Sequence, residues 1–112
     1  MSYQNERLSS FLKKEIAIYL TKNFPHPTDV FISVTEVVVD QSLETAKIFI
    51  SVFPDKKAND ILKSIKAYEN EIRKFLSSRL RRHKIPKINF VLDKNFESGI
   101  RLEKLLENSE DK

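Results

Sequence analysis

VFISVTEVVVDQSLETAKIFISVF, residues 30–53, carries the pattern that decides the fold. Its first ten residues are mostly β-branched and contain no glycine, which is typical of a strand. Asp40 and Ser42 then favour a turn. The second half alternates in polarity, and one of its faces consists of Ala46, Ile48, Ile50 and Val52. We therefore expect an antiparallel pair of strands with one buried face.

Helical patterns flank this pair on both sides. Apolar residues recur at helical spacing before it and predict a helix over about residues 4–23, which the prolines of FPHPTD end. A second apolar pattern starts at Ile61 and runs for about 25 residues. It predicts one long helix that extends as far as Lys84. After Pro86, KINFVLD alternates and predicts a third strand with Ile88, Phe90 and Leu92 inward.

The expected order is helix, strand, strand, long helix, strand. Three strands cannot close into a barrel, so we expect an α+β, two-layer domain whose helices cover one face of a three-stranded sheet. The 112 residues are enough for one core. A single domain is expected over residues 1–106, with an amphipathic section at 100–106 and a polar tail at 107–112 that frays.

Composition argues against catalysis and against bound cofactors. The chain has no cysteine, two histidines and one glycine, Gly99, so thiolate chemistry and a glycine-rich phosphate loop are excluded. A metal site would have to rest on carboxylates, and the acidic pairs Asp40/Glu44 and Asp55/Asp60 fit turns and helix caps better. We expect no enzyme activity, metal, cofactor or small-molecule substrate.

The sequence also lacks the features of membrane insertion and export. No apolar run is long enough to span a membrane, and the first residues lack the pattern of a signal peptide. We expect a cytoplasmic monomer.

Positive charge is concentrated in one part of the chain. The net charge is +4 overall. Residues 69–84 contain six cations and two carboxylates, whereas residues 29–54 contain one cation and four carboxylates. Between Glu71 and Asp93 there is no acidic residue. The dipole at a helix C-terminus accounts for one or two such cations, and a polyanionic partner accounts for the surplus.

A helical wheel places most of these cations on the solvent face. With Ile65 buried, the outer face holds Lys63, Lys74 and Arg81, and one flank holds Lys66, Arg73 and Lys84. A solvated charged face is the simplest alternative. Arg79 lies out of phase, and we expect its stem to cover the edge of the core. Phe49 and Phe53 share the other face of the sheet, where they are either a stacking platform or packed by a tail or loop.

These residues together resemble the bacterial ribosome-binding factor A family over about residues 5–106. The resemblance rests on the strand pair quoted above, on EIRKFLSSRL and on IPKINFVLDKNFESGIRLEKLL. Five single residues match family positions in order: Arg73, Pro86, Phe90, Asp93 and Gly99.

The resemblance implies a type II KH-like fold in which an Ala-x-Gly kink between two helices replaces the usual glycine-rich loop. Ala67, Tyr68 and Glu69 stand at that place, without the glycine. An unbroken apolar phase predicts one helix here, and the resemblance implies two. It also implies a partner, the immature small ribosomal subunit and its ribosomal RNA near the 5′-terminal helix and the neck, with a role in late maturation and RNA processing.

We expect RNA to be bound by basic residues of this helical segment and by two residues at the expected kink. The full set is Lys63, Lys66, Ala67, Tyr68, Arg73, Lys74, Arg81, Arg82 and Lys84. The alternative is a protein-interaction module whose basic helix docks an acidic protein.

Overall fold

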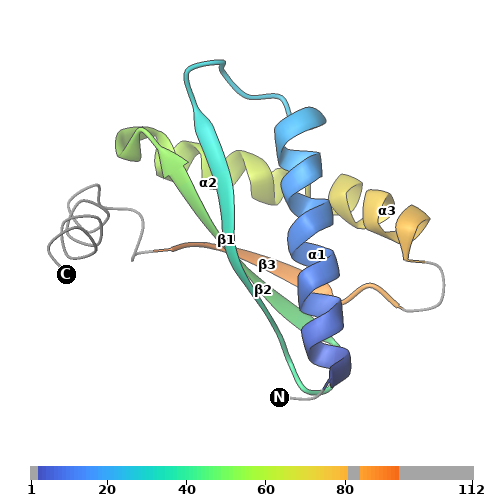
Figure 1. Cartoon of the computed structure of the whole chain (residues 1–112). Helices are drawn as coiled ribbons and strands as arrows, with labels where there is room; N and C mark the ends of the chain where they lie inside the picture. The colour runs from blue at the N-terminus through green and yellow to red at the C-terminus, as the bar shows by residue number, and fades with distance from the viewer. Residues whose placement is uncertain (1–2, 81–83, 94–112) are drawn as a thin grey trace, which may run out of the picture.

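The chain folds into a helix-covered sheet of mixed strands. The structure is a computed structural model that describes residues 3–80 and 84–93. Its elements follow in this order: α1 (Tyr3–Lys22), β1 (Phe31–Val39), β2 (Thr45–Phe53), a 3₁₀ turn (Asp55–Lys57), α2 (Ala58–Ala67), α3 (Glu69–Arg79) and β3 (Lys87–Leu92). The expected α+β class and strand order are confirmed (Figure 1).

The strand β2 lies in the middle of the sheet. It pairs antiparallel with β1, from Phe31 opposite Phe53 to Val39 opposite Ala46. It pairs parallel with β3, from Thr45 beside Lys87 to Ile50 beside Leu92. A parallel neighbour needs a crossover connection, and α2 and α3 provide it.

Strand β1 contains a β-bulge because its inward apolar residues change from even to odd positions along the strand. Ile32 and Val34 lie opposite the inward Val52 and Ile50, but the next inward residues are Val37 and Val39. An unbroken strand would turn one of these pairs to the outer face. The register shifts between Val34 and Glu36, and the residue between them absorbs the change.

One core lies between the helices and the inner face of the sheet. Ala46, Ile48, Ile50 and Val52 are all buried, as the alternation predicted. Ile88 and Phe90 are buried too, and Leu92 is half-buried. The helix residues that pack against them are Leu12, Ile16, Tyr19, Leu20, Ile61, Ile65, Ile72 and Leu76.

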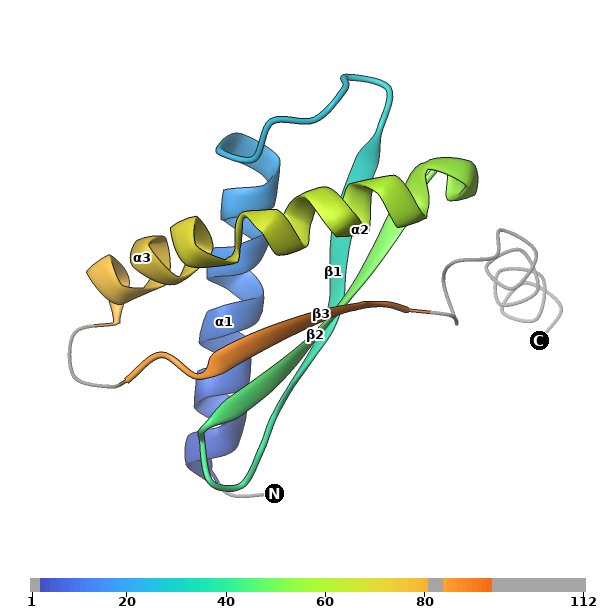
Figure 2. The same ribbon diagram turned by 180° about the vertical axis from the view of Figure 1, so that it is seen from behind.

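The prediction of one long helix is wrong. Helix α2 ends at Ala67, Tyr68 lies outside both helices, and α3 begins at Glu69, so the two helices of the resemblance are confirmed. Helix α3 packs on α1, and α2 packs on the strands β2 and β3 (Figure 2). The apolar phase survives the break, which is why periodicity did not reveal it.

Helix α3 also ends earlier than the sequence predicted, since the predicted helix extended to Lys84. It stops at Arg79, and Leu80 has φ −109° and ψ 86°, close to extended geometry. Lys84 is therefore in the segment before β3 and not on a helical flank. The predictions for Arg81, the section 100–106 and the tail 107–112 lie outside the described residues.

The bulge residue Thr35 connects β1 to Asp93, the residue that follows β3. The Thr35 hydroxyl lies 2.6 Å from Asp93 Oδ2 and 3.3 Å from the Phe49 carbonyl oxygen, and its single proton goes to the nearer carboxylate. The Asp93 backbone N–H donates to the Ile50 carbonyl at 2.7 Å. Asp93 is buried, so its carboxylate depends on protein donors.

Thr35→Val is expected to lower the free energy of unfolding by about 1–3 kcal/mol, because a buried carboxylate loses a donor. Chemical denaturation measures the change. Thr45→Val is the matched control, since Thr45 is exposed on β2, and should change stability by within about 0.5 kcal/mol. Equal losses in the two variants would show that the bulge contact contributes nothing specific.

Candidate nucleic-acid interface

The outward faces of α2 and α3 carry exposed cations. Lys63 and Lys66 are exposed on α2, and Lys74 is exposed on α3. The opposite faces of the same helices are buried at Ile61, Ile65, Ile72 and Leu76. Core packing thus fixes the rotation of both helices and points the three ammonium groups to solvent.

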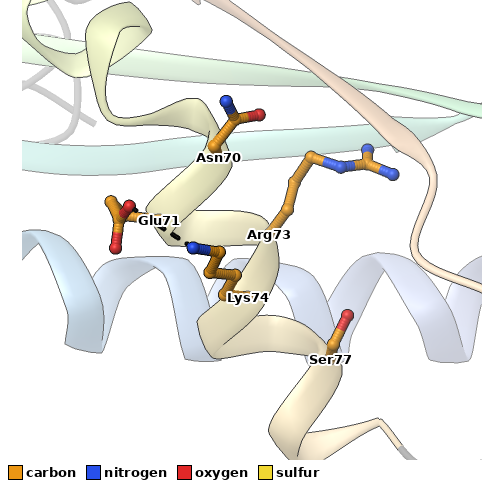
Figure 3. A pocket seen from close by; sticks show the side chains of 5 residues that line it. All are labelled: Asn70, Glu71, Arg73, Lys74 and Ser77. Carbon is orange, nitrogen blue, oxygen red and sulfur yellow. Dashed lines mark ion pairs between the residues drawn. The ribbon is translucent and has the colours of Figure 1, made fainter.

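A hollow of about 500 Å³ lies on α3 just after the bend. Figure 3 shows its lining, which comes entirely from α3: Asn70, Glu71, Arg73, Lys74 and Ser77. Lys74 Nζ lies 3.9 Å from Glu71 Oε1, and both side chains are mostly exposed. Surface pairs of this kind contribute little, so the pair leaves Lys74 available to a stronger anion.

The bend between α2 and α3 is held by aromatic packing. Tyr68 has φ −96° and ψ 9°, a negative φ that needs no glycine. Its N–H donates to the Ile65 carbonyl at 2.9 Å, one residue short of the helical partner. Its ring meets the buried Phe24 ring edge-on at a centroid distance of 5.2 Å. The chain therefore bends with Glu69 in place of the family glycine.

Arg73 holds the segment that leads into β3. Its guanidinium donates to the Pro86 carbonyl at 2.5 Å and to the Ile85 carbonyl at 3.2 Å. Charge-assisted bonds of this kind are among the stronger ones in proteins. In Figure 3 its side chain extends away from α3, on the other side from Glu71. The structure therefore gives Arg73 a positioning role.

A larger cleft of about 740 Å³ opens beyond Arg73. It lies between the first turns of α1, the β1–β2 turn and the segment that leads into β3. Its lining residues are Arg7, Leu8, Phe11, Ser42, Leu43, Glu44, Arg73, Leu80, Lys84, Ile85, Pro86 and Lys87. Four of these are cations and one is a carboxylate. Arg73 lines both the cleft and the hollow on α3.

The β1–β2 turn is fixed by side-chain hydrogen bonds. The backbone N–H and the hydroxyl of Ser42 donate to Asp40 Oδ2, at 3.3 and 2.5 Å. These bonds favour the charged form and lower the pKa of Asp40 below its ordinary value. The Asn5 amide donates to the Val39 and Asp40 carbonyls, which joins the start of α1 to the same turn.

The predicted site residues fall into three groups. Lys63, Lys66, Ala67, Lys74 and Lys84 are exposed. Tyr68 is half-buried at the bend and Arg73 is bound to backbone carbonyls. Arg81 and Arg82 lie outside the described residues.

Two cations of the cleft, Arg7 and Lys87, were not predicted. Helical periodicity carries no information on which segment α1 packs against, so no sequence signal marked Arg7. Lys87 follows Pro86 at the start of a strand, and the sequence alone predicts an ordinary solvent-facing residue there.

Arg79 has a partner within the fold. Its Nε lies 3.3 Å from Glu15 Oε1, and its guanidinium carbon lies 4.7 Å from the centre of the Phe75 ring. Glu15 is buried on α1, so the pair balances a carboxylate that has left water. This agrees with the expectation that Arg79 covers the edge of the core.

The outer face of the sheet carries aromatic rings. Phe31 and Phe53 lie opposite each other and are 64% and 66% exposed, whereas Phe49 is half-buried beneath Lys47. The helices that the structure describes all pack on the other face. Within the described residues a single lysine, Lys47, lies over one of these rings, whereas three exposed lysines lie on α2 and α3, so we place the candidate interface on the α2–α3 side.

The described part of the chain offers neither a metal site nor a membrane-spanning helix. Residues 3–80 and 84–93 hold no group of three or more histidine or acidic side chains placed to bind a metal ion. None of the helices in this part of the chain is both long enough and apolar enough to cross a membrane.

The sequence matches a known family over most of its length. The family model described as ribosome-binding factor A matches residues 4–106. The ribosome-binding factor A of Chlorobium phaeobacteroides is 35% identical over 109 residues, which cover 95% of this chain and 93% of the relative. That of Halothermothrix orenii is 36% identical over 101 residues, which cover 89% and 83%.

Solved structures share the fold. The crystal structure of ribosome-binding factor A from Thermus thermophilus aligns with a TM-score of 0.68 at 17% identity, covering 80% of this chain and 97% of that one. A homology model of the Thermus protein, fitted into a cryo-EM map of its complex with the 30S subunit, aligns at 0.63 and 18% identity over 76% and 90%. The type II KH-like arrangement is confirmed.

Arg73→Met is expected to lower the free energy of unfolding by about 1.5–3 kcal/mol, the loss typical for hydrogen bonds from a charged group. Lys74→Met is the matched control at the next, exposed position and should change stability by within about 0.5 kcal/mol. Urea unfolding of both variants measures the difference. Similar stability of the two variants would contradict the positioning role of Arg73.

Proposed function

The chain belongs to the ribosome-binding factor A family, and from that premise we propose that it binds the immature small ribosomal subunit through ribosomal RNA. The contact region is the RNA near the 5′-terminal helix and the neck, and binding assists late maturation and processing of that RNA. The protein acts as a cytoplasmic monomer and binds without catalysing a reaction.

The continuity of cations on one side of the molecule carries this proposal. Exposed lysines on α2 and α3 lead to Arg73, and Arg73 borders the cleft with its three further cations. Phosphates repeat along an RNA strand, so a line of cations releases several counterions at once. The cryo-EM work on the Thermus relative, which places that protein on a 30S subunit, supports the same class of partner.

Arg81 and Arg82 remain predicted RNA contacts, together with the bend at Ala67 and Tyr68. The two arginines follow α3 in the sequence and precede Lys84 at the cleft.

Salt dependence tests the proposal. With four to six phosphates neutralised, log affinity for a small-subunit RNA fragment should fall against log salt with a slope of roughly −3 to −5. The triple variant Lys63→Glu, Lys66→Glu, Lys74→Glu should weaken binding and reduce the magnitude of the slope by about 2–3, at 0.7–0.9 per lost contact. Equilibrium titration at several salt concentrations measures both.

The matched control is Lys13→Glu, Lys14→Glu, Lys22→Glu, which makes the same charge change at exposed positions of α1. It should leave most of the slope intact. A slope shallower than about −1 for the unaltered protein is too small for several phosphate contacts and would contradict RNA as the partner. Equally tight binding of a polyglutamate chain would favour the alternative, an acidic protein.

A further inference from the structure

The cleft beside Arg73 combines an apolar floor with a cationic rim. Leu8, Phe11, Leu43 and Leu80 line it, and each is only partly buried against the core. Arg7, Lys84 and Lys87 border the same space. A surface that serves only to attract phosphate needs no apolar floor, so the cleft calls for a ligand with an apolar face and a negative charge.

Leu43 takes an unusual backbone conformation at this floor. Its φ is 64°, which is uncommon for any residue with a Cβ. The turn holds it there, because the Leu43 N–H donates to the Asp40 carbonyl at 2.9 Å and the Glu44 N–H reaches the Ser42 hydroxyl at 3.3 Å. Glycine or asparagine would suit this position better, so the leucine side chain itself accounts for the choice. That side chain lies where the core meets the cleft.

The wall of the cleft is held in place from two sides. Arg73 binds the Ile85 and Pro86 carbonyls, and the Lys87 N–H donates to the Glu44 carbonyl at 2.8 Å. These bonds connect the segment that leads into β3 both to α3 and to the β1–β2 turn. The cleft is therefore formed before any ligand arrives, which reduces the entropy lost on binding.

We infer that this cleft binds a single unpaired nucleotide of RNA, with the base on the floor at Leu43 and Phe11 and the adjoining phosphates on Lys84 and Lys87. An unstacked base offers an apolar face, and its backbone supplies the charge on both sides. The inference rests on the proposed function and makes it more specific: the protein recognises RNA where a base has left the helix.

Continuity with the α2–α3 surface favours RNA over an acidic peptide. Arg73 lines both the hollow on α3 and the cleft, so a strand that crosses it meets Lys74 on one side and Lys84 on the other. An RNA strand carries a phosphate on each side of every base and fits that order. The bases of a paired A-form helix are stacked inside it, so only an unpaired nucleotide can reach the floor.

Three RNA hairpins test the inference: a fully paired stem, the same stem with one bulged nucleotide, and the bulged stem with an abasic residue in the bulge. The unaltered protein should bind the bulged stem roughly tenfold more tightly than the other two, the effect of one stacked base. Leu43→Asn keeps a residue that tolerates positive φ but removes the apolar side chain. It should abolish the preference and leave binding to the paired stem unchanged.

Val38→Asn is the matched control, because Val38 is an exposed apolar residue on the outer face of the sheet. It should retain the preference. The inference is overturned if the unaltered protein shows no preference, if Leu43→Asn retains it, or if the abasic bulge binds as tightly as the complete one. Loss of binding to all three hairpins would instead remove the proposed function, which separates the two failures.

Methyl NMR of the unaltered protein gives a readout that does not depend on how the variant folds. The methyl signals of Leu8 and Leu43 should shift when the bulged hairpin is added and stay in place with the paired one. Shifts of these methyls that are larger with a polyglutamate peptide than with the bulged hairpin would show that the cleft prefers an acidic protein and would overturn the inference.

Discussion

The bidentate contact of Arg73 with the Ile85 and Pro86 carbonyls determines how the two ends of the crossover meet. Helix α3 and strand β3 belong to different layers, and the chain between them must return to the start of a strand that is buried on one face. The carbonyls of this segment have no strand partner, so a fixed guanidinium supplies their donors. The cleft, the start of β3 and the orientation of α3 all depend on this contact.

The bend at Tyr68 shows where local sequence preference gives way to packing. Good helix formers and an unbroken apolar phase favoured one long helix through this point, and the resemblance implied two. The Tyr68 ring packs on Phe24, a contact between residues 44 positions apart in the chain, and only the fold brings them together. Sequence periodicity could not contain it. The strands were easier to predict, because alternation at Ala46 to Val52 reports burial directly.

The residues of the candidate site also divide into those that the sequence pattern predicts and those that only the packing of the fold brings there. Lys63, Lys66 and Lys74 were predictable, because a cation opposite an apolar stripe must face solvent. Arg73 was placed on the same surface by its charge and its phase, yet its guanidinium is bound to the backbone. Arg7 and Lys87 join the site only through the packing of α1 and the pairing of β3, which no local pattern records. Charge and phase therefore identified the helices that carry the exposed lysines, but not the residues that shape the cleft between α1, the β1–β2 turn and the segment that leads into β3.

Lysine-selective chemical labelling, followed by mass spectrometry, tests most directly which side of the protein meets RNA. The full chain is labelled free and bound to purified small ribosomal subunits, and exposed lysines lie on α1, on the sheet, on α2 and α3 and at the cleft. The account predicts that binding protects one set of side chains: Lys63, Lys66, Lys74, Lys84 and Lys87. It predicts unchanged labelling of a second set on α1 and the outer face of the sheet: Lys13, Lys14, Lys22 and Lys47. Protection of the second set with continued labelling of the first would contradict it.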